Sequence, residues 1–330
     1  MAPLWKKKPV LGLGLGVGIL GALAIALRHQ SRKSLREPIP NEISPTIFAT
    51  RVADTSRGEM IYHICGTGEP IVFLHGFFLG ASSYEWSKIY PQFAHGREVI
   101  APDWIGFGES ERPEEAMDAS DYADCLSEFL RNVCPKRPAI IVASGVTCQV
   151  VLLLAARHPD LVSRLVLFLP TGLKSSEQTR QLGLMANKIP GWSRFIYQNH
   201  VASPQFIRNW LSKSGFSAAQ PPSEETVSIL TTCARQYGAE HAIFGLMRNR
   251  KTFNASARAS QVLAPTHILW PSQATGFDSS EATALTAQLP DADLEFLPEA
   301  SLFEAMANPV EISKSLFRWL DGDLVSSSVA

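Results

Sequence analysis

The sequence predicts an α/β protein in which a mostly parallel sheet is covered by helices on both faces. From Ile47 onward, short apolar runs of strand length alternate with amphipathic stretches of helix length. This alternation is typical of parallel strands joined by helical crossovers. Hydrophobic residues make up 45% of the 330 residues, enough for a large core in a single α/β domain. One stretch without strand-like runs, residues 171–260, interrupts the pattern.

The N-terminal residues differ from the rest of the chain in charge and hydropathy. Residues 1–8 are basic, and residues 9–27 contain no charged side chain. As a helix, this apolar run would be about 28 Å long, close to the thickness of a bilayer's hydrocarbon core. We therefore expect a single-pass transmembrane anchor at 9–27. A cleaved signal peptide, with Ala24 and Ala26 at the cleavage site, is the alternative.

Both flanks of the apolar run are basic, so the charge pattern leaves the side of the membrane undecided. Gly12 and Gly16 form a small-residue pair through which two such helices could pack as a homodimer. Residues 28–45 contain three prolines and are expected to form a polar linker.

The body of the chain is expected to contain eight strands and five helices outside the interrupting stretch. The expected strands are 47–53, 59–65, 70–74, 97–101, 138–143, 164–169, 265–270 and 293–297. The expected helices are 82–93, 119–133, 146–158, 280–288 and 309–320.

Helix-like segments at 203–215 and 225–250 lie within the interrupting stretch. An insertion there would lie over the carboxyl edge of the sheet, where open α/β sheets bind ligands. The expected organisation is thus a core and an inserted helical cap. The ranges are 46–170 and 261–322 for the core, 171–260 for the cap and 323–330 for a tail.

Composition excludes several classes of function. Outside the first 36 residues the chain has 23 basic and 31 acidic residues, and this acidic balance excludes a nucleic-acid partner. The five cysteines are scattered and form no CxxC pair, which argues against a disulfide framework or a zinc site. We expect no metal and no cofactor.

Several motifs follow the expected strands in a fixed order. "IVFLHGFFLGASSYEW" (71–86) ends the third strand, and "VIAPDWIGFGESERP" (99–113) follows the fourth. "LAARHPDLVSRLVLFLPTG" (154–172) surrounds the sixth, and 291–320 contains the last strand and a closing helix. Together these segments resemble the α/β-hydrolase superfamily over about residues 47–320, most of all its epoxide hydrolase and haloalkane dehalogenase-like branch. The resemblance implies an α/β-hydrolase fold with an eight-stranded sheet and a helical cap after the sixth strand.

The resemblance also implies where a catalytic triad would lie, and this chain departs from the family at each position. Counting back from "AARHPD", the nucleophile of the G-x-S-x-G elbow falls on Gly145. The acid after the seventh strand falls on Ala274, and the general base falls on Leu302. Asp278 and Glu281 are the nearby carboxylates that could replace the acid.

Steric rules of the elbow favour Gly145 over its neighbour Ser144. The elbow needs small residues two positions before and after the nucleophile, and Val142 and Val146 would occupy those positions around Ser144. Ser144 is therefore a weak substitute nucleophile, expected to point away from the pocket. Glycine adopts the left-handed turn at little cost, whereas a side chain there is strained by about 1–3 kcal/mol.

The remaining motif residues predict a binding pocket. By resemblance, the oxyanion loop at His75, Gly76 and Phe77 and the amide of Val146 would bind a carbonyl or carboxylate group. Its apolar walls are expected from the cap: Phe206, Trp210, Phe244 and Met247.

We expect a membrane-anchored, catalytically degenerate hydrolase-fold protein that binds a small apolar or carboxylate-bearing ligand or a protein partner. The alternatives are an active hydrolase of esters or similar small apolar substrates that uses a rearranged site, and a purely structural scaffold.

Overall fold

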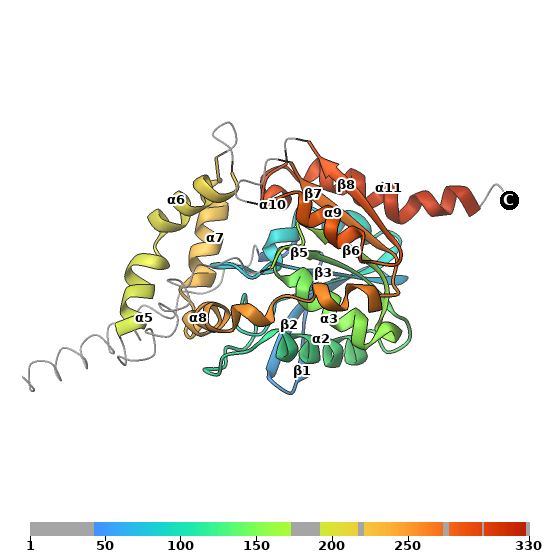
Figure 1. Cartoon of the computed structure of the whole chain (residues 1–330). Coiled ribbons are helices and arrows are strands. Elements are labelled where there is room, and N and C mark those ends of the chain that lie inside the picture. Colours follow the sequence, from blue (N-terminus) through green and yellow to red (C-terminus); the bar gives the residue numbers. More distant parts are fainter. Residues whose placement is uncertain (1–42, 173–191, 217–220, 273–276, 299, 328–330) are drawn as a thin grey trace, which may run out of the picture.

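An eight-stranded sheet forms the centre of the molecule in the computed structural model (Figure 1). The structure describes residues 43–172, 192–216, 221–272, 277–298 and 300–327. The strand order is β1-β2-β4-β3-β5-β6-β7-β8. β1 pairs antiparallel with β2 and β2 antiparallel with β4, and all later pairs are parallel. The predicted α/β class with a mostly parallel sheet is confirmed.

Each expected strand is present, with ends shifted by a few residues. The strands are β1 (Ala49–Thr55), β2 (Gly58–Cys65), β3 (Glu69–Leu74), β4 (Arg97–Pro102), β5 (Ala139–Ser144), β6 (Val162–Phe168), β7 (Thr266–Pro271) and β8 (Ala292–Leu297).

Alternation along β3 divides the core between the two faces of the sheet. Val72 and Leu74 belong to the cluster that packs against α2 (Ala119–Val133) and α3 (Thr147–Arg157). Ile71 and Phe73 belong to the cluster on the other face, with side chains of α11 (Pro309–Ser327). Successive residues of a strand point to opposite faces, so a strand that is apolar throughout is buried on both.

The helix expected at 82–93 is instead two short 3-10 turns, η2 (Ser83–Trp86) and η3 (Tyr90–Phe93). Pro91 lies in the first turn of η3. Proline lacks an amide hydrogen and disfavours a helical conformation in the residue before it, so a continuous α-helix is interrupted here. The segment is held by burial, since Trp86, Tyr90 and Phe93 are almost inaccessible to solvent.

Between β6 and β7 the described residues form helices that lie beside the sheet, at the left in Figure 1. They are α5 (Trp192–Ile196), a π-helical turn η5 (Tyr197–Val201), α6 (Pro204–Ser214), α7 (Glu224–Ala234) and α8 (Ala239–Asn249). These insertion helices have their own apolar cluster, which includes Ile207, Leu211 and Leu230. Two short 3-10 turns, η6 (Arg250–Thr252) and η7 (Ser256–Gln261), lead back to β7.

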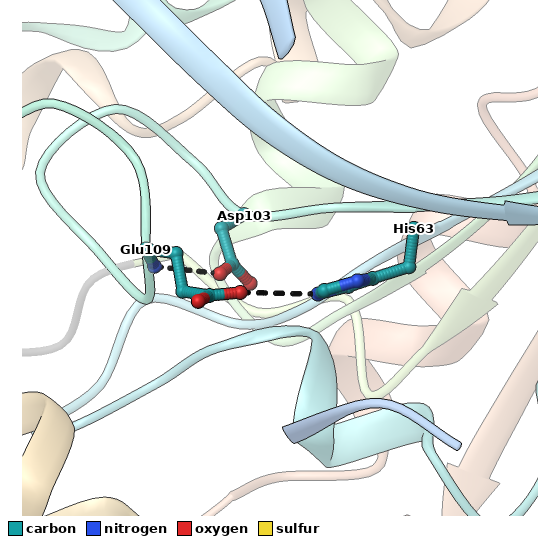
Figure 2. A group of neighbouring side chains, drawn as sticks. All are labelled: His63, Asp103 and Glu109. Carbon is teal, nitrogen blue, oxygen red and sulfur yellow. Dashed lines mark hydrogen bonds and ion pairs between the residues drawn. The ribbon is translucent and has the colours of Figure 1, made fainter. Parts of the chain in front are cut away.

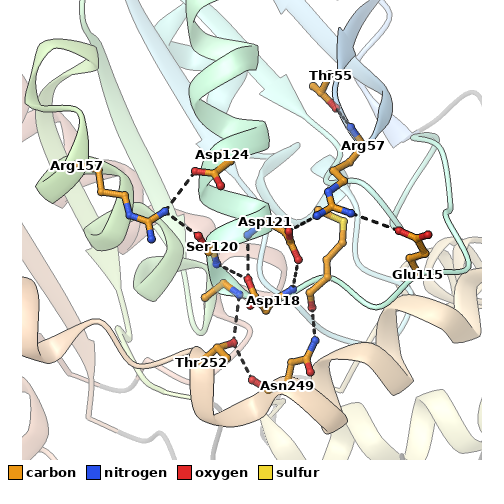
Figure 3. A network of polar contacts seen from close by, with 12 residues as sticks. Thr55, Arg57, Glu115, Asp118, Ser120, Asp121, Asp124, Arg157, Asn249 and Thr252 are labelled. Carbon is orange, nitrogen blue, oxygen red and sulfur yellow. Dashed lines mark hydrogen bonds and ion pairs between the residues drawn. The ribbon is translucent and has the colours of Figure 1, made fainter.

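Polar contacts fasten the end of the insertion to the start of α2 (Figure 3). Asn249 donates to the Met117 carbonyl at 3.1 Å, and the Ala119 amide donates to the Thr252 hydroxyl at 3.2 Å. Asp118, the residue before α2, accepts from the first-turn amides of that helix and forms a capping box with Asp121. Helix capping and the attachment of the insertion therefore share one network.

The remaining helices close the fold at its C-terminal end. They are α9 (Ser280–Thr286), α10 (Glu304–Ala307) and α11. A further short 3-10 turn, η4 (Pro159–Leu161), lies between α3 and β6. Among the described residues, no helix is both long enough and apolar enough to cross a membrane. The anchor that the sequence predicts at 9–27, and most of the linker that follows it, lie outside those residues.

Candidate functional site

The turn from β5 into α3 forms the floor of the candidate site. Gly145 occupies it with a φ of +57°, in the left-handed region. Its amide donates to the Phe168 carbonyl at 2.9 Å, which ties the turn to the neighbouring strand β6. A Cβ atom at this position would meet nothing within 4 Å. The space in front of Gly145 is therefore open, and the backbone angle is one that glycine adopts without strain.

A cavity of about 310 Å³ lies above this turn. Gly76, Phe77, Ser144, Gly145 and Val146 line its floor. The walls come from three parts of the chain: the carboxyl end of β6, the insertion helices and the segment before α10. They include Phe168, Thr171, Trp210, Leu302 and Phe303. Except at its floor the cavity is mainly apolar, so it suits a ligand with a carbon skeleton and one polar group.

Two backbone amides at the floor are available to a ligand. Within the described residues, neither the Phe77 amide nor the Val146 amide donates a hydrogen bond. Val146 precedes the 11-residue helix α3, whose N-terminus carries a partial positive charge. Paired amides at a helix N-terminus stabilise an oxyanion or a carboxylate. Of the four residues expected to form the oxyanion loop and its partner amide, Gly76, Phe77 and Val146 line the cavity together. His75 does not line it.

His75 supports the loop from behind. Its Nδ1 donates to the Gly76 carbonyl at 2.9 Å, and its Nε2 accepts from the Trp104 amide at 3.1 Å. These two bonds require the neutral ring with the proton on Nδ1. Burial lowers the pKa of His75, in agreement with a neutral ring. His75 is therefore a positioning residue that holds Gly76 and Phe77 in place.

Glu85 is a polar residue of the cavity that the sequence reasoning missed. It lies on η2, is 4% exposed, and accepts a hydrogen bond from the Gly76 amide at 2.6 Å. Burial raises the pKa of Glu85 to about 7, although the Gly76 amide and the Ser144 hydroxyl oppose this. The sequence predicts this position as part of a helix at 82–93, and the available signal was a lone glutamate between two aromatic residues, Tyr84 and Trp86.

The elbow rule predicts that Ser144 points away from the cavity. In the structure Ser144 instead lines it. A Cβ atom on Gly76 would lie 3.0 Å from the Ser144 hydroxyl oxygen, so the two residues are in close approach. The hydroxyl is buried and makes no well-aligned hydrogen bond, although it is near enough to lower the pKa of Glu85. The prediction failed because the strand ends with Ser144 itself, directly before the left-handed turn.

The other two expected triad positions give separate outcomes. Leu302 is half-buried and lines the cavity. Ala274 lies outside the described residues. Asp278, considered as a replacement acid, accepts from the Ser280 amide at 2.9 Å near the start of α9. Of the four insertion residues expected in the walls, Trp210 lines the cavity, and Phe206 is 45% exposed instead.

A cluster elsewhere in the fold brings together one histidine and two carboxylates (Figure 2). Ligand atoms of His63, Asp103 and Glu109 lie within 4.8 Å of one another, a spacing that could hold a metal ion. The backbone already uses Asp103, which accepts from the Ser83 amide at 2.6 Å and from the Glu109 amide at 2.7 Å. Arg112 lies near enough to lower the pKa of Glu109, which burial and Asp103 raise. We interpret the cluster as the internal support of the loop after β4.

Among the described residues one more histidine is buried, His267 on β7. It pairs with Glu295 at 3.2 Å and stacks on Trp319, on the sheet face that carries α11. His241, on α8, lies 3.6 Å from Glu240, and neither residue lines the cavity above Gly145. These histidines are thus separate from the candidate site.

Comparison with known proteins agrees with the fold. A family model for the alpha/beta hydrolase fold matches residues 69–209. The chain is 35% identical over 112 residues to a 2-hydroxymuconate semialdehyde hydrolase of Pseudomonas sp. (strain CF600), across 34% of this chain and 40% of that protein. It is 30% identical over 151 residues to a soluble epoxide hydrolase of Corynebacterium sp. (strain C12), across 43% and 52%. The matched regions thus span about half or less of these relatives.

Solved structures match over more of the chain. A serine hydrolase of carbazole degradation superposes with a TM-score of 0.70 at 16% identity, covering 83% of this chain and 98% of that one. A haloalkane dehalogenase variant from Bradyrhizobium elkanii gives 0.65 at 22% identity, covering 85% and 99%. The sheet and the turn at Gly145 define a protein of the α/β-hydrolase fold. Residues 69–209 match the family model, and the two relatives named above are similar in sequence over parts of the chain, which agrees with this fold.

Proposed function

We propose that this chain is a catalytically degenerate α/β hydrolase that binds a small apolar ligand carrying a carbonyl or carboxylate group. One observation carries the proposal: a glycine occupies the left-handed turn between β5 and α3, where the family places its nucleophile. The unpaired amides of Phe77 and Val146 remain to bind an oxygen. The insertion helices act in this proposal as the cap, with Trp210 over the cavity.

The proposal separates binding from turnover, and one pair of measurements tests both. The full-length chain should show thermal stabilisation and ligand-observed NMR signals with medium-chain fatty acids or aryl carboxylates. It should not react with a fluorophosphonate probe and should not hydrolyse p-nitrophenyl esters above the rate in buffer. Stoichiometric labelling by the probe would contradict the proposal, as would the absence of any bound ligand.

A second candidate, an active hydrolase with a rearranged site, is supported by the pair formed by Ser144 and Glu85. Both line the cavity, and a carboxyl group with a pKa of about 7 could accept a proton from a serine hydroxyl. The known relatives named above are hydrolases by their descriptions. This candidate requires that esterase activity and probe labelling disappear in Ser144→Ala and persist in Ser82→Ala, a serine outside the cavity lining.

We further propose that residues 9–27 anchor the chain in a membrane as a single span. The support is the length of the uncharged run and its basic flanks. Leu15→Asp together with Ile19→Asp should release the full-length chain from membranes during carbonate extraction, because each charge near a span's centre costs about 3 kcal/mol. Ser34→Asp, in the expected linker, is the control. A mature chain that begins after Ala26 would instead indicate a cleaved signal peptide.

A further inference from the structure

Glu85 is the one ionisable side chain among the described residues that line the cavity. It is placed by η2, whose four residues are all buried. The Gly76 amide donates to its Oε2, and the next residue, Phe77, carries one of the two unpaired amides. The carboxyl group therefore contacts the residue next to Phe77, whose amide belongs to the oxygen-binding floor described above.

Among the described residues, the surroundings of Glu85 offer no positive charge to balance an ionised carboxylate. The groups that influence its pKa are the Gly76 amide and the Ser144 hydroxyl, both neutral. From α3, the Cys148 thiol faces it with a pKa held well above its usual value, first by burial and then by Glu85 itself. His75 is buried with a lowered pKa and bonds the Gly76 carbonyl and the Trp104 amide. Within the part of the chain that the structure describes, no neighbour of Glu85 is therefore a cation at neutral pH.

An anion bound at the floor and an ionised Glu85 would repel each other strongly. Two carboxylates that share a buried site do not both ionise, and one of them keeps its proton to high pH. The Phe77 and Val146 amides and the N-terminus of α3 favour the negative charge on the ligand. The proton then falls to Glu85, for which burial already favours the neutral form.

We propose that the cavity binds a monocarboxylic acid together with one proton, which Glu85 shares with the ligand's carboxyl group as an O–H···O hydrogen bond. The inference rests on the proposed binding function and names the class of ligand and the residue that selects it. Below neutral pH Glu85 holds the proton before the ligand arrives. Above neutral pH the solvent supplies it when the ligand binds.

Proton uptake on binding makes the affinity for a carboxylate depend on pH in a way that can be measured. Affinity for a carboxylate should be nearly constant between about pH 5.5 and 6.5 and should fall about tenfold for each pH unit above pH 7, since the protonated fraction of Glu85 falls by that factor. The matching primary amide carries no charge and can donate to an ionised Glu85. Its affinity should not fall over the same range.

Isothermal titration calorimetry of the full-length chain with octanoate and with octanamide, from pH 6 to pH 9, tests the proposal. At pH 8, repeating the octanoate titration in phosphate and in Tris should show the uptake of about one proton per ligand. Glu85→Gln keeps an acceptor for the Gly76 amide and adds a donor for the ligand. This variant should bind octanoate at pH 8 about tenfold more tightly than the parent, with no proton uptake.

Glu304→Gln is the matched control, because Glu304 is also buried and accepts a backbone amide, from Ser301 at 2.9 Å, but does not line the cavity. This variant should keep the parent's dependence on pH. Octanoate binding without proton uptake, or with the same dependence on pH in Glu85→Gln, overturns this inference alone. If neither octanoate nor octanamide binds at any pH, the proposed binding function fails, and the inference fails with it.

Discussion

The backbone angle φ at Gly145 determines which residue types can occupy this turn without strain. The residue combines a φ of +57° with open space in front of its Cα atom. At most of the described glycines with a positive φ, a side chain would collide with a neighbouring atom. At Gly66 and Gly80, for example, a Cβ atom would lie within 2.5 Å of backbone oxygens. At Gly145 only the left-handed backbone angle favours glycine, because no neighbouring atom would collide with a Cβ atom. A side chain there is therefore strained but not sterically excluded.

Gly145→Ala should therefore fold and retain the cavity while losing about 1–2 kcal/mol of unfolding free energy to left-handed strain. Gly322→Ala is the matched control, because its Cβ atom also meets nothing within 4 Å but its backbone is helical. That substitution should stabilise the protein by about 0.5–1 kcal/mol. Denaturant unfolding measures both, and equal effects of the two alanines would argue against a strained turn.

The raised pKa of Glu85 should be visible in the stability of the protein. The folded state keeps a proton that the unfolded chain releases, so the contribution of Glu85 is full below its usual pKa and is lost as pH rises to about 7. Relative to the parent, Glu85→Gln should become more stable between pH 5 and pH 8, by a few kcal/mol at most. Unfolding curves at both pH values give this difference, and an unchanged difference would contradict the raised pKa.

Sequence reasoning located Gly145 but not Glu85, for a physical reason. The glycine is found by counting within a strand-turn-helix unit whose spacing is rigid. Glu85 reaches the cavity through a 3-10 turn that the sequence predicted as part of an α-helix. The direction of its side chain depends on that turn, and no periodic pattern encodes it.

At the scale of single elements, the start of α2 was the part most closely specified by local sequence. The segment D-A-S-D places Asp118 and Asp121 three residues apart. The carboxylate of each aspartate accepts a hydrogen bond from the backbone amide of the other. Such reciprocal bonds satisfy amides that a helix leaves unpaired at its first turn. The predicted range, 119–133, is accordingly the observed one.

Asp118→Ala should cost about 1–2 kcal/mol of unfolding free energy, because two first-turn amides lose their acceptor. Asp124→Ala lies in the same helix and removes an ion pair with Arg157 at 3.3 Å. Its Asp124 side chain is 57% exposed, so this control should cost less than about 0.5 kcal/mol. Chemical denaturation of both variants checks the prediction, which would be wrong if Asp118→Ala were the milder change.

For the whole molecule, the order of elements was predictable, and the way the insertion meets the core was not. All eight strands lie near their expected ranges. The inner strands β3, β5 and β7 are apolar runs that are buried almost throughout, whereas the outer strands β1 and β8 are largely not buried. The cavity walls depend instead on contacts between distant segments. Trp210 packs edge-on against Phe303 with ring centroids 5.1 Å apart, which joins α6 to the residues before α10. The sequence predicts both Phe206 and Trp210 as apolar walls from the cap, and only their packing in the structure distinguishes them.

Trp210→Ala should weaken ligand binding about tenfold or more, because it removes a cavity wall that also meets Phe78 and Phe303. Phe206→Ala, one turn earlier on the same helix, should leave the affinity unchanged, because Phe206 is 45% exposed and does not line the cavity. Octanoate affinity at pH 6.5 is the measurement. Equal losses in the two variants would place the ligand elsewhere.

The open space in front of Gly145 also makes this position chemically addressable. A cysteine introduced there would place a thiol on the cavity floor, within reach of a small labelling reagent. Burial raises the pKa of four of the five native cysteines: Cys125, Cys134, Cys148 and Cys233. Those thiols react slowly at neutral pH, since the thiolate is the reactive form. The turn could thus carry a spectroscopic reporter of cavity occupancy, and ligands could be sought without any turnover to follow.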